Sequence, residues 1–264
     1  MTSPGTWGFD VTVPNVARIY DYLLGGKDNF EADRRAAERL LAAAPETIVT
    51  VRENREFLRR AVRELARAGV RQFVDVGAGL PTASNVHEVA REVVPDARVV
   101  YVDNDPVVVT HGRALLAGRP GVTVVEGDVR DPAALLADPG LRAVVDFAEP
   151  VAVLLLAVLH FVPDESDPEG VVAALRAPLC PGSALVLSHV TNEGSRPEAV
   201  SATNSVYDNA SARITLRSRE RVAGLFAGLT LEEPGLVYAP EWRPERRSPL
   251  DPASSFLLVG VGRC

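Results

Sequence analysis

The sequence predicts a doubly wound α/β domain that follows an N-terminal helical extension. Three observations support this prediction. Apolar residues recur at helical spacing before residue 70, and short β-branched runs alternate with helix-like stretches after it. The chain then closes with two strand-like runs that have no helix between them, which favours an antiparallel hairpin at one sheet edge. We expect a helical cap over 1–69 and a sheet domain over 70–264, packed as one compact unit.

The extension is expected to hold three helices. The first has its apolar residues on one helical face, at Val16, Ile19, Tyr20, Leu23 and Leu24. Gly25 is suited to end this helix. Asp28 and Glu31 have the spacing of a capping box, which predicts a second helix over 30–43. A third helix is expected over 46–68, ended by Gly69.

The sheet domain is expected to begin with five parallel strands. The β-branched runs that predict them are 71–76, 97–102, 122–126, 151–156 and 183–190. Helices are expected between them at 84–94, 105–117, 132–137 and 168–179. A helix at 218–227, the run LTLEEPGLV and a strand at 255–262 close the chain.

The polar stretch 191–213 has few large apolar residues, so it predicts an irregular insertion. From its position and polarity we expect a substrate lid. Its candidate lid residues are Asn204, Tyr207, Asp208 and Arg213.

Composition argues against several classes of function. The chain has 264 residues, of which 47% are apolar and 24% charged, as in an ordinary globular protein. A net charge of −7 and a pI of about 5.2 argue against a nucleic-acid partner. We see no secretory signal pattern and no apolar run of the ~18 residues that span a membrane, so we expect no membrane partner.

Cys180 and Cys264 have no metal-ligand spacing. Such sparse cysteine use suits free thiols in a reducing cytoplasm, and it predicts no metal site.

The glycine-rich turn GAGLPT follows the first expected strand, with Gly77, Ala78 and Gly79 at its start. In a doubly wound sheet this turn is where a nucleotide-like ligand approaches the backbone. A tight turn with no ligand is the alternative. The dinucleotide fingerprint would need a third glycine at position 82, which is Thr82 after Pro81, so NAD is disfavoured.

Acidic residues mark the carboxyl ends of the first three expected strands. Asp75 lies within the first strand, where a charge needs a partner, so it either bonds turn amides or faces a cationic ligand. Asp103, followed by Asn104, ends the second strand, where an acid can accept both ribose hydroxyls. Asp128 and Val129 follow the third strand and are suited to hold an adenine. Together with the glycine turn, these residues predict an adenosine site.

These motifs resemble those of the class I S-adenosylmethionine-dependent methyltransferases. The stretches DVGAGLPT, YVDND, EGDVRD and LLLAVLHF correspond in order to motifs on the first four strands, although Pro81 departs from the usual glycine-rich turn. The resemblance implies a Rossmann-like seven-stranded sheet with an antiparallel last strand. It also implies S-adenosylmethionine as the cofactor.

A more specific resemblance covers nearly the whole chain. Residues 13–40 together with 150–164 are similar to an actinobacterial S-adenosyl methyltransferase family that was formerly a domain of unknown function. This implies a methyltransferase, and the acidic pI favours a small-molecule acceptor. A non-catalytic S-adenosylmethionine binder or sensor stays open as an alternative, and an NAD-dependent oxidoreductase is a weaker one.

The extension also holds candidate cofactor residues. Arg55 interrupts the apolar stripe of the third helix, beside Asn54, so it either pairs with a buried acid or binds the methionine carboxylate of the cofactor. In the stretch YDYLLGGKDNF we expect Tyr22, Lys27 and Asn29 to line the cofactor or substrate pocket. Tyr20 is expected in the core, and Gly25 and Asp28 are expected to be structural.

His160 is the leading candidate for a general base, because it ends the fourth strand region where the methyl group is expected. A histidine bonded to a nearby carbonyl is the alternative. His189, at the end of the fifth strand, is a weaker candidate for the base. Asp146 is expected to be structural.

Overall fold

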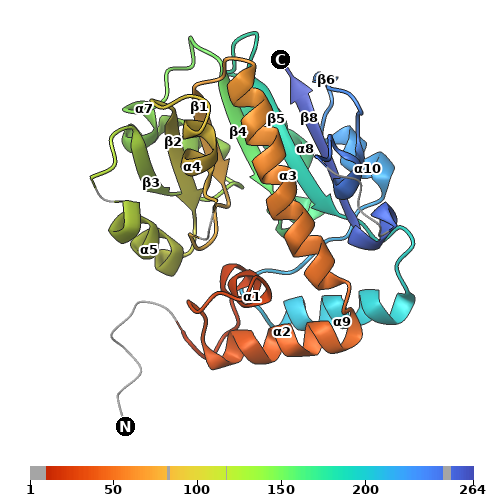
Figure 1. The fold of residues 1–264 in the computed structure, drawn as a ribbon. Coiled ribbons are helices and arrows are strands. Elements are labelled where there is room, and N and C mark those ends of the chain that lie inside the picture. Colours follow the sequence, from red (N-terminus) through yellow and green to blue (C-terminus); the bar gives the residue numbers. More distant parts are fainter. Residues whose placement is uncertain (1–9, 82–83, 117, 246–250) are drawn as a thin grey trace.

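The computed structural model describes residues 10–81, 84–116, 118–245 and 251–264. One sheet of eight strands lies between two layers of helices, and a helical cap covers the end of the sheet toward which the parallel strands run (Figure 1). The doubly wound α/β prediction is confirmed, as is the antiparallel closing strand.

The strand order is β3-β2-β1-β4-β5-β8-β6, with β7 also paired to β8. The first five strands are parallel, and β8 is antiparallel to β5. The strands are β1 Gln72–Val76, β2 Arg98–Asp103, β3 Val122–Glu126, β4 Val151–Leu156, β5 Ala184–Val190, β6 Thr230–Leu231, β7 Val237–Tyr238 and β8 Leu257–Arg263.

The sheet has eight strands where seven were expected, because the strand predicted within LTLEEPGLV is divided. Residues 232–236 separate β6 from β7, and both short strands pair antiparallel with β8. Since β5 occupies one edge of β8 along its whole length, β6 and β7 lie along the other edge.

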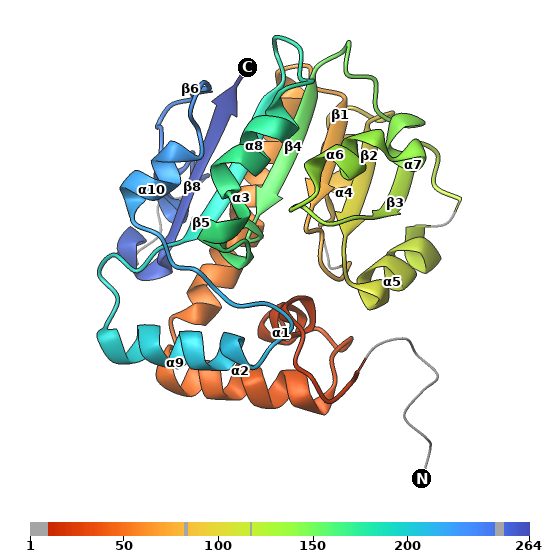
Figure 2. The same cartoon turned by 180° about the vertical axis from the view of Figure 1, so that it is seen from behind.

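Helices cover both faces of the sheet (Figures 1 and 2). Alternate strand residues face opposite layers: Phe73 and Val99 pack into one core, and Val74 and Val100 into the other. The first layer holds α3 Thr47–Arg67, α4 Val86–Arg91 and α5 Pro106–Leu116. The second holds α6 Pro132–Ala137, α7 Pro139–Arg142, α8 Pro168–Arg176 and α10 Arg219–Gly224. The short 3₁₀ turns are Leu159–Phe161, Asp164–Ser166, Ala239–Glu241 and Pro252–Ser255.

The cap consists of α1 Val16–Leu23, α2 Glu31–Ala43 and α9 Pro197–Asp208. These helices share a third apolar core, and α9 lies along α2 although more than half of the chain separates them (Figure 1). The expected irregular insertion at 191–213 is therefore wrong over α9. The division at residue 69 stays a prediction, but the packing groups α3 with the sheet, because its residues Phe57 and Leu65 are buried in the first sheet core.

Within the described residues, no helix has the length and apolarity needed to cross a membrane.

Candidate active site

A cavity of about 880 Å³ lies between the carboxyl ends of the parallel strands and the cap. That volume is in the range of small-molecule sites, roughly 300–1,000 Å³. Most of the candidate site residues line it: Arg55, Asp75, Gly77, Ala78, Gly79, Asp103, Asn104, Asp128, Val129 and His160. The structure thus brings the strand ends, the glycine turn and α3 to one space.

The glycine turn is fixed by contacts with the neighbouring strands. Gly77 has a φ of +75° and donates to the Val102 carbonyl at 2.8 Å. A Cβ at Gly77 would lie 2.6 Å from a methyl group of Val158, so no larger residue fits without displacement. Gly79 has a φ of +65°. Thr82, at the position of the absent third glycine, lies outside the described residues.

Asp103 organises the end of β2. One carboxylate oxygen accepts from the Gly79 amide at 2.9 Å, and the other accepts from the Asp105 amide at 2.9 Å. Burial raises the pKa of Asp103, while these backbone donors oppose that rise. Because a carboxylate oxygen has two lone pairs, both oxygens retain capacity to accept from a ligand hydroxyl.

Asp128 at the end of β3 is already engaged by a neighbour. Its carboxylate accepts from the Arg130 guanidinium and amide, and from the Asn104 side chain at 3.3 Å. The hydrogen bond from Arg130 lowers the pKa of Asp128. Arg130, which sequence reasoning missed, also lines the cavity, and about half of its side chain is exposed.

Asp75 is buried at the cavity wall, and burial raises its pKa to about 7. The positive charge of Arg55 opposes this rise, and the negative charge of Asp103 adds to it. Arg55 also donates to the Ser84 carbonyl at 3.0 Å. Arg55 therefore has the buried acid Asp75 nearby, which agrees with the first of the two interpretations drawn from the sequence. Arg55 also lines the cavity, so the second interpretation, binding of the methionine carboxylate, stays open.

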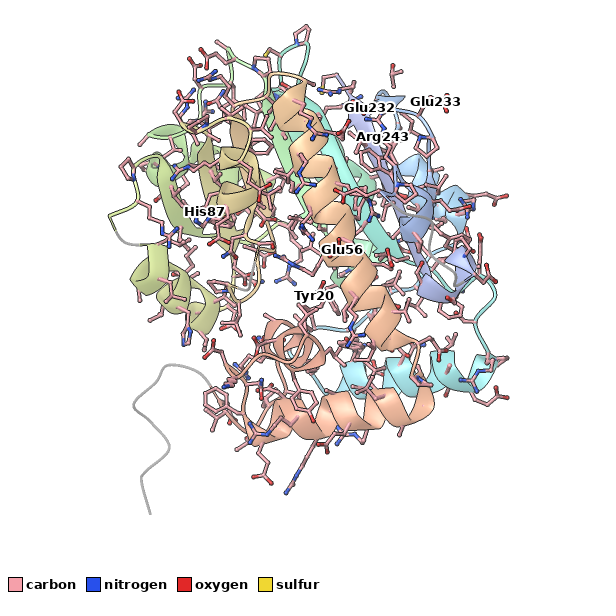
Figure 3. All side chains as sticks on the ribbon, viewed as in Figure 1. Tyr20, Glu56, His87, Glu232, Glu233 and Arg243 are labelled. Atoms are coloured by element: carbon pink, nitrogen blue, oxygen red, sulfur yellow. The ribbon has the colours of Figure 1, made fainter. Side chains whose placement is uncertain are left out.

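A chain of hydrogen bonds connects the cap to the end of β4. Asn54 donates to the Tyr20 hydroxyl at 2.9 Å, and its carbonyl oxygen accepts from Ser188 at 2.7 Å. Ser188 in turn accepts from the Ala157 amide at 2.8 Å. Ala157 has a φ of +53°, an uncommon conformation for a residue with a Cβ, and it lines the cavity. Tyr20 lies between α1 and α3, as Figure 3 shows.

Arg18 forms a second buried connection, which sequence reasoning also missed. Its guanidinium donates to Asp33 at 2.8 Å and lies 3.7 Å from the Asp105 carboxylate. All three side chains are almost fully buried. This cluster ties both N-terminal helices of the cap to the start of α5. Nothing in the local sequence signals it, since Arg18 falls on the polar side of the apolar stripe.

His160 is buried, and its ring forms no hydrogen bond within the described residues; its buried Nδ1 has no partner there. The alternative interpretation, in which the His160 ring forms a hydrogen bond with a nearby carbonyl, is therefore wrong for the described residues. Burial, helped by the nearby His189 and Arg217, holds the pKa of His160 well below its usual range. The ring is neutral at physiological pH.

His189 does not line the cavity. Its Nδ1 bonds the Val190 carbonyl at 2.8 Å and its Nε2 bonds Arg217 at 2.9 Å, so both nitrogens are occupied. Arg217 also holds the Leu159 carbonyl at 2.9 Å and fixes the loop that carries His160.

The turn after α1 is closed by Asp21. The Asp21 carboxylate accepts from the Asp28 amide at 3.0 Å and from the Asn29 side chain at 2.8 Å. Tyr22 bonds Glu38 at 3.2 Å. Tyr22, Lys27 and Asn29 are not among the cavity-lining residues, contrary to expectation.

The start of α2 also differs from expectation. Phe30 precedes the helix, and its amide donates to Asp33 at 2.8 Å. The expected capping box of Asp28 and Glu31 is therefore wrong.

The lid candidates on 191–213 separate into two groups. Tyr207 and Arg213 line the cavity, whereas Asn204 and Asp208 are exposed and do not. Asp146 serves local structure, because its carboxylate accepts from the Ala148 amide at 2.9 Å.

Known proteins resemble this chain over nearly its whole length. A family model described as S-adenosyl methyltransferase matches residues 5–264. A crystal structure of a candidate methyltransferase from Thermobifida fusca YX has 43% identity and a TM-score of 0.90, and the match covers 96% of both chains. A DUF574 family protein from Streptomyces avermitilis MA-4680 has 40% identity and a TM-score of 0.92, with 96% of this chain and 98% of that chain covered.

Two more distant proteins also match. Human N-acetylserotonin methyltransferase, solved in complex with S-adenosylmethionine, shares the fold at 16% identity and a TM-score of 0.51, over 95% of this chain and 62% of that chain. An ornithine lipid N-methyltransferase of Singulisphaera acidiphila is 36% identical over 84 residues, which are 32% of this chain and 43% of that relative. This chain therefore matches less than half the length of that relative.

Proposed function

This chain belongs to the S-adenosyl methyltransferase family, whose cofactor is S-adenosylmethionine, and we propose that it transfers the methyl group to a small-molecule acceptor held in the cavity under the cap. One observation carries the proposal: the glycine turn and the acids of β1, β2 and β3 converge on a single cavity. The two thiols, Cys180 and Cys264, are free, which supports a cytoplasmic location.

The adenosine is proposed to lie across the ends of β2 and β3. Asp103 accepts the ribose hydroxyls, aided by Asn104, and its carboxylate is held in place by the Gly79 amide at 2.9 Å. Asp128 accepts from the adenine amine, and Val129 provides an apolar contact. In this arrangement Arg130 gives up some of its hydrogen bonds to the Asp128 carboxylate when the ligand binds.

The methionine end of the cofactor is proposed to lie over Gly77 and Ala78. Asp75 and Arg55 lie near each other at that end of the cavity. The Asp75 carboxylate can therefore pair with the ammonium group of the ligand, and the Arg55 guanidinium with its carboxylate. The buried Asp75 becomes ionised when it meets the cationic ligand, because the ligand charge offsets the cost of burial.

When bound, S-adenosylmethionine supplies an electrophilic methyl group on a sulfonium. The residues of this chain orient the acceptor, exclude water and take up a proton. His160 is proposed to receive the acceptor proton, because its ring is neutral and makes no hydrogen bond within the described residues. The cap helices α1, α2 and α9 are proposed to close the site, with 191–213 contributing one wall.

The test is a calorimetric titration of the purified protein with S-adenosylmethionine, S-adenosylhomocysteine and NAD, alongside Asp103→Ala. Micromolar binding of the first two ligands, lost in the variant, supports the site. Glu126→Gln is a matched control, because Glu126 is the register partner of Asp103 on β3 but is exposed and does not line the cavity. Binding of NAD alone, or equal binding by both variants, would contradict the assignment.

A further inference from the structure

We propose that the part of the cavity beyond β4 is the acceptor subsite, and that it takes a neutral, planar aromatic molecule carrying a hydroxyl group. This inference rests on the proposed function, because the cofactor must occupy the other part of the cavity. It names a substrate class and a set of residues that contact the substrate.

The strand order separates the two parts of the cavity. The proposed cofactor residues come from β1, β2 and β3, which lie on one side of β4. The rest of the lining comes from the segments after β4 and β5, from α9, and from α1, α2 and α3. Six residues define this acceptor subsite: His160, Phe161, Thr191, Ala199, Thr203 and Tyr207. The methyl group lies between the two parts, where the ends of β1 and β4 adjoin.

Three rings follow one another along the wall of the subsite. The ring centroids of His160 and Phe161 are 4.5 Å apart, and those of Phe161 and Tyr207 are 5.3 Å apart. Their planes are inclined by 60° and 57°. Aromatic side chains are stabilised by offset or edge contacts with another ring, beyond the area that they bury. A flat aromatic acceptor is the molecule that makes most use of this wall.

Polar groups without partners flank Phe161. Within the described residues, the buried Nδ1 of His160 has no hydrogen-bond partner. The Tyr207 side chain is mostly buried and lines the cavity, and its hydroxyl forms no hydrogen bond with the described residues. A buried polar group left unpaired is destabilising, so His160 favours a ligand that pairs with it, and the Tyr207 hydroxyl is available to the same ligand. A hydroxyl both donates and accepts, and it can therefore satisfy a neutral imidazole and a tyrosine.

Three charged side chains line this end of the cavity, and each is either paired with another residue or exposed. Glu46 lies 3.7 Å from Arg196, and Arg213 lies 3.4 Å from Asp208 with 81% of its side chain exposed. Glu165 is exposed. The six residues that define the acceptor subsite carry methyl, hydroxyl, aromatic and neutral imidazole groups, which cannot offset the charge of an ionised acceptor. The acceptor is therefore neutral.

The reaction in this subsite balances with the groups present. A lone pair of the acceptor oxygen forms the new C–O bond as the C–S bond breaks, and the electron pair of that bond stays on sulfur. The hydroxyl proton passes to His160 and then to water.

The test uses 2-naphthol as a probe, titrated by calorimetry into protein saturated with S-adenosylhomocysteine. Octan-1-ol is neutral but not planar, and naphthalene-2-sulfonate is planar but charged. We expect 2-naphthol to bind at least ~10-fold more tightly than either, a ratio that corresponds to about 1.4 kcal/mol. With S-adenosylmethionine instead, 2-methoxynaphthalene should appear by mass spectrometry.

Three variants locate the binding. Thr203→Trp fills the subsite and should weaken 2-naphthol by ~10-fold or more while S-adenosylhomocysteine binds as before. Ser201→Trp is the matched control, because Ser201 is exposed on the same helix. Tyr207→Phe removes only a hydroxyl and should weaken 2-naphthol by roughly 3–10-fold, the worth of one hydrogen bond.

The outcomes separate the two proposals. Failure of the wild-type protein to bind S-adenosylhomocysteine would overturn the proposed function itself. Binding of S-adenosylhomocysteine with no preference for 2-naphthol would overturn only the acceptor class. Equal loss of both ligands in Thr203→Trp would show that this wall belongs to the cofactor and would overturn the subsite.

Discussion

Asn54 and Ser188 lie 134 residues apart in the chain and share a hydrogen bond of 2.7 Å in the interior. The bond joins α3 to β5, and each residue has one further partner: Asn54 donates to Tyr20 and Ser188 accepts from Ala157. Buried polar groups that are satisfied in this way favour one arrangement of the elements around them. Here they fix the cap and the end of β4 relative to each other.

Ser188→Ala is expected to destabilise the protein by roughly 2–4 kcal/mol, because it leaves the Asn54 oxygen and the Ala157 amide unpaired. Urea denaturation measures the loss. Ser205→Ala, on the exposed side of α9, should change stability by no more than about 0.5 kcal/mol. If Ser188→Ala matches this control, the connection carries no stabilising energy.

Gly77→Ala is expected to lower stability by more than Gly79→Ala. Both residues have a positive φ, which costs an alanine about 1–2 kcal/mol. Only at Gly77 does the new Cβ also meet Val158, at 2.6 Å, whereas the space at Gly79 is open. Combining Gly77→Ala with Val158→Ala should recover the steric part in a double-mutant cycle. Additivity of the two changes would contradict the close approach.

Arg18→Met is expected to destabilise the protein by about 3–5 kcal/mol, because it leaves Asp33 and Asp105 as buried carboxylates without their cation. Arg35→Met is the control on α2. Arg35 pairs with Glu31 at the surface, with both side chains more than 60% exposed, so its loss should cost no more than about 0.5 kcal/mol. Equal midpoints in urea for the two variants would contradict a structural role for the Arg18 cluster.

Asp75→Asn is expected to change how stability depends on pH. The pKa of Asp75 is about 7 in the folded protein, against 3.8 ordinarily, so the unfolded chain loses its proton first as pH rises. Wild-type stability should therefore fall between pH 4 and 7 by roughly 2–4 kcal/mol and then level off, a fall that the variant lacks. The difference between the two proteins is diagnostic, since burial also raises the pKa of Asp103. If urea denaturation shows the same dependence of stability on pH for the wild type and for Asp75→Asn, the raised pKa of Asp75 is ruled out.

The sheet could be predicted from the sequence because its parallel strands are buried on both faces, and such strands are nearly continuous apolar runs. The helix starts were less predictable. The start of α2 depends on the hydrogen bond from the Phe30 amide to Asp33. From the sequence alone, Asp28 was an equally plausible capping residue. The helix α9 was missed because only Ala199, Val206 and Tyr207 are buried on it, too few to mark an apolar stripe.

The strand-end residues of the site could be predicted for a geometric reason. Parallel strands bring their carboxyl ends to one edge, so Asp75, Asp103 and Asp128 had to lie near one another. The contacts of Arg18 with Asp105 and of Asn54 with Ser188 join distant segments, and no local pattern encodes them. Asn29 was wrongly expected to line the pocket, because its side chain donates a hydrogen bond to Asp21 within the turn.

The cap is built from segments that are far apart in the chain, and this affects how the protein folds during synthesis. Its helices α1 and α2 leave the ribosome early, but their partner α9 begins only at Pro197. At about 5–20 residues per second, the apolar stripes of α1 and α2 wait roughly 8–30 seconds for α9. During that interval Ile19 and Leu40 lack the part of their core that α9 completes, so their apolar surface stays incompletely covered until Pro197–Asp208 has been synthesised.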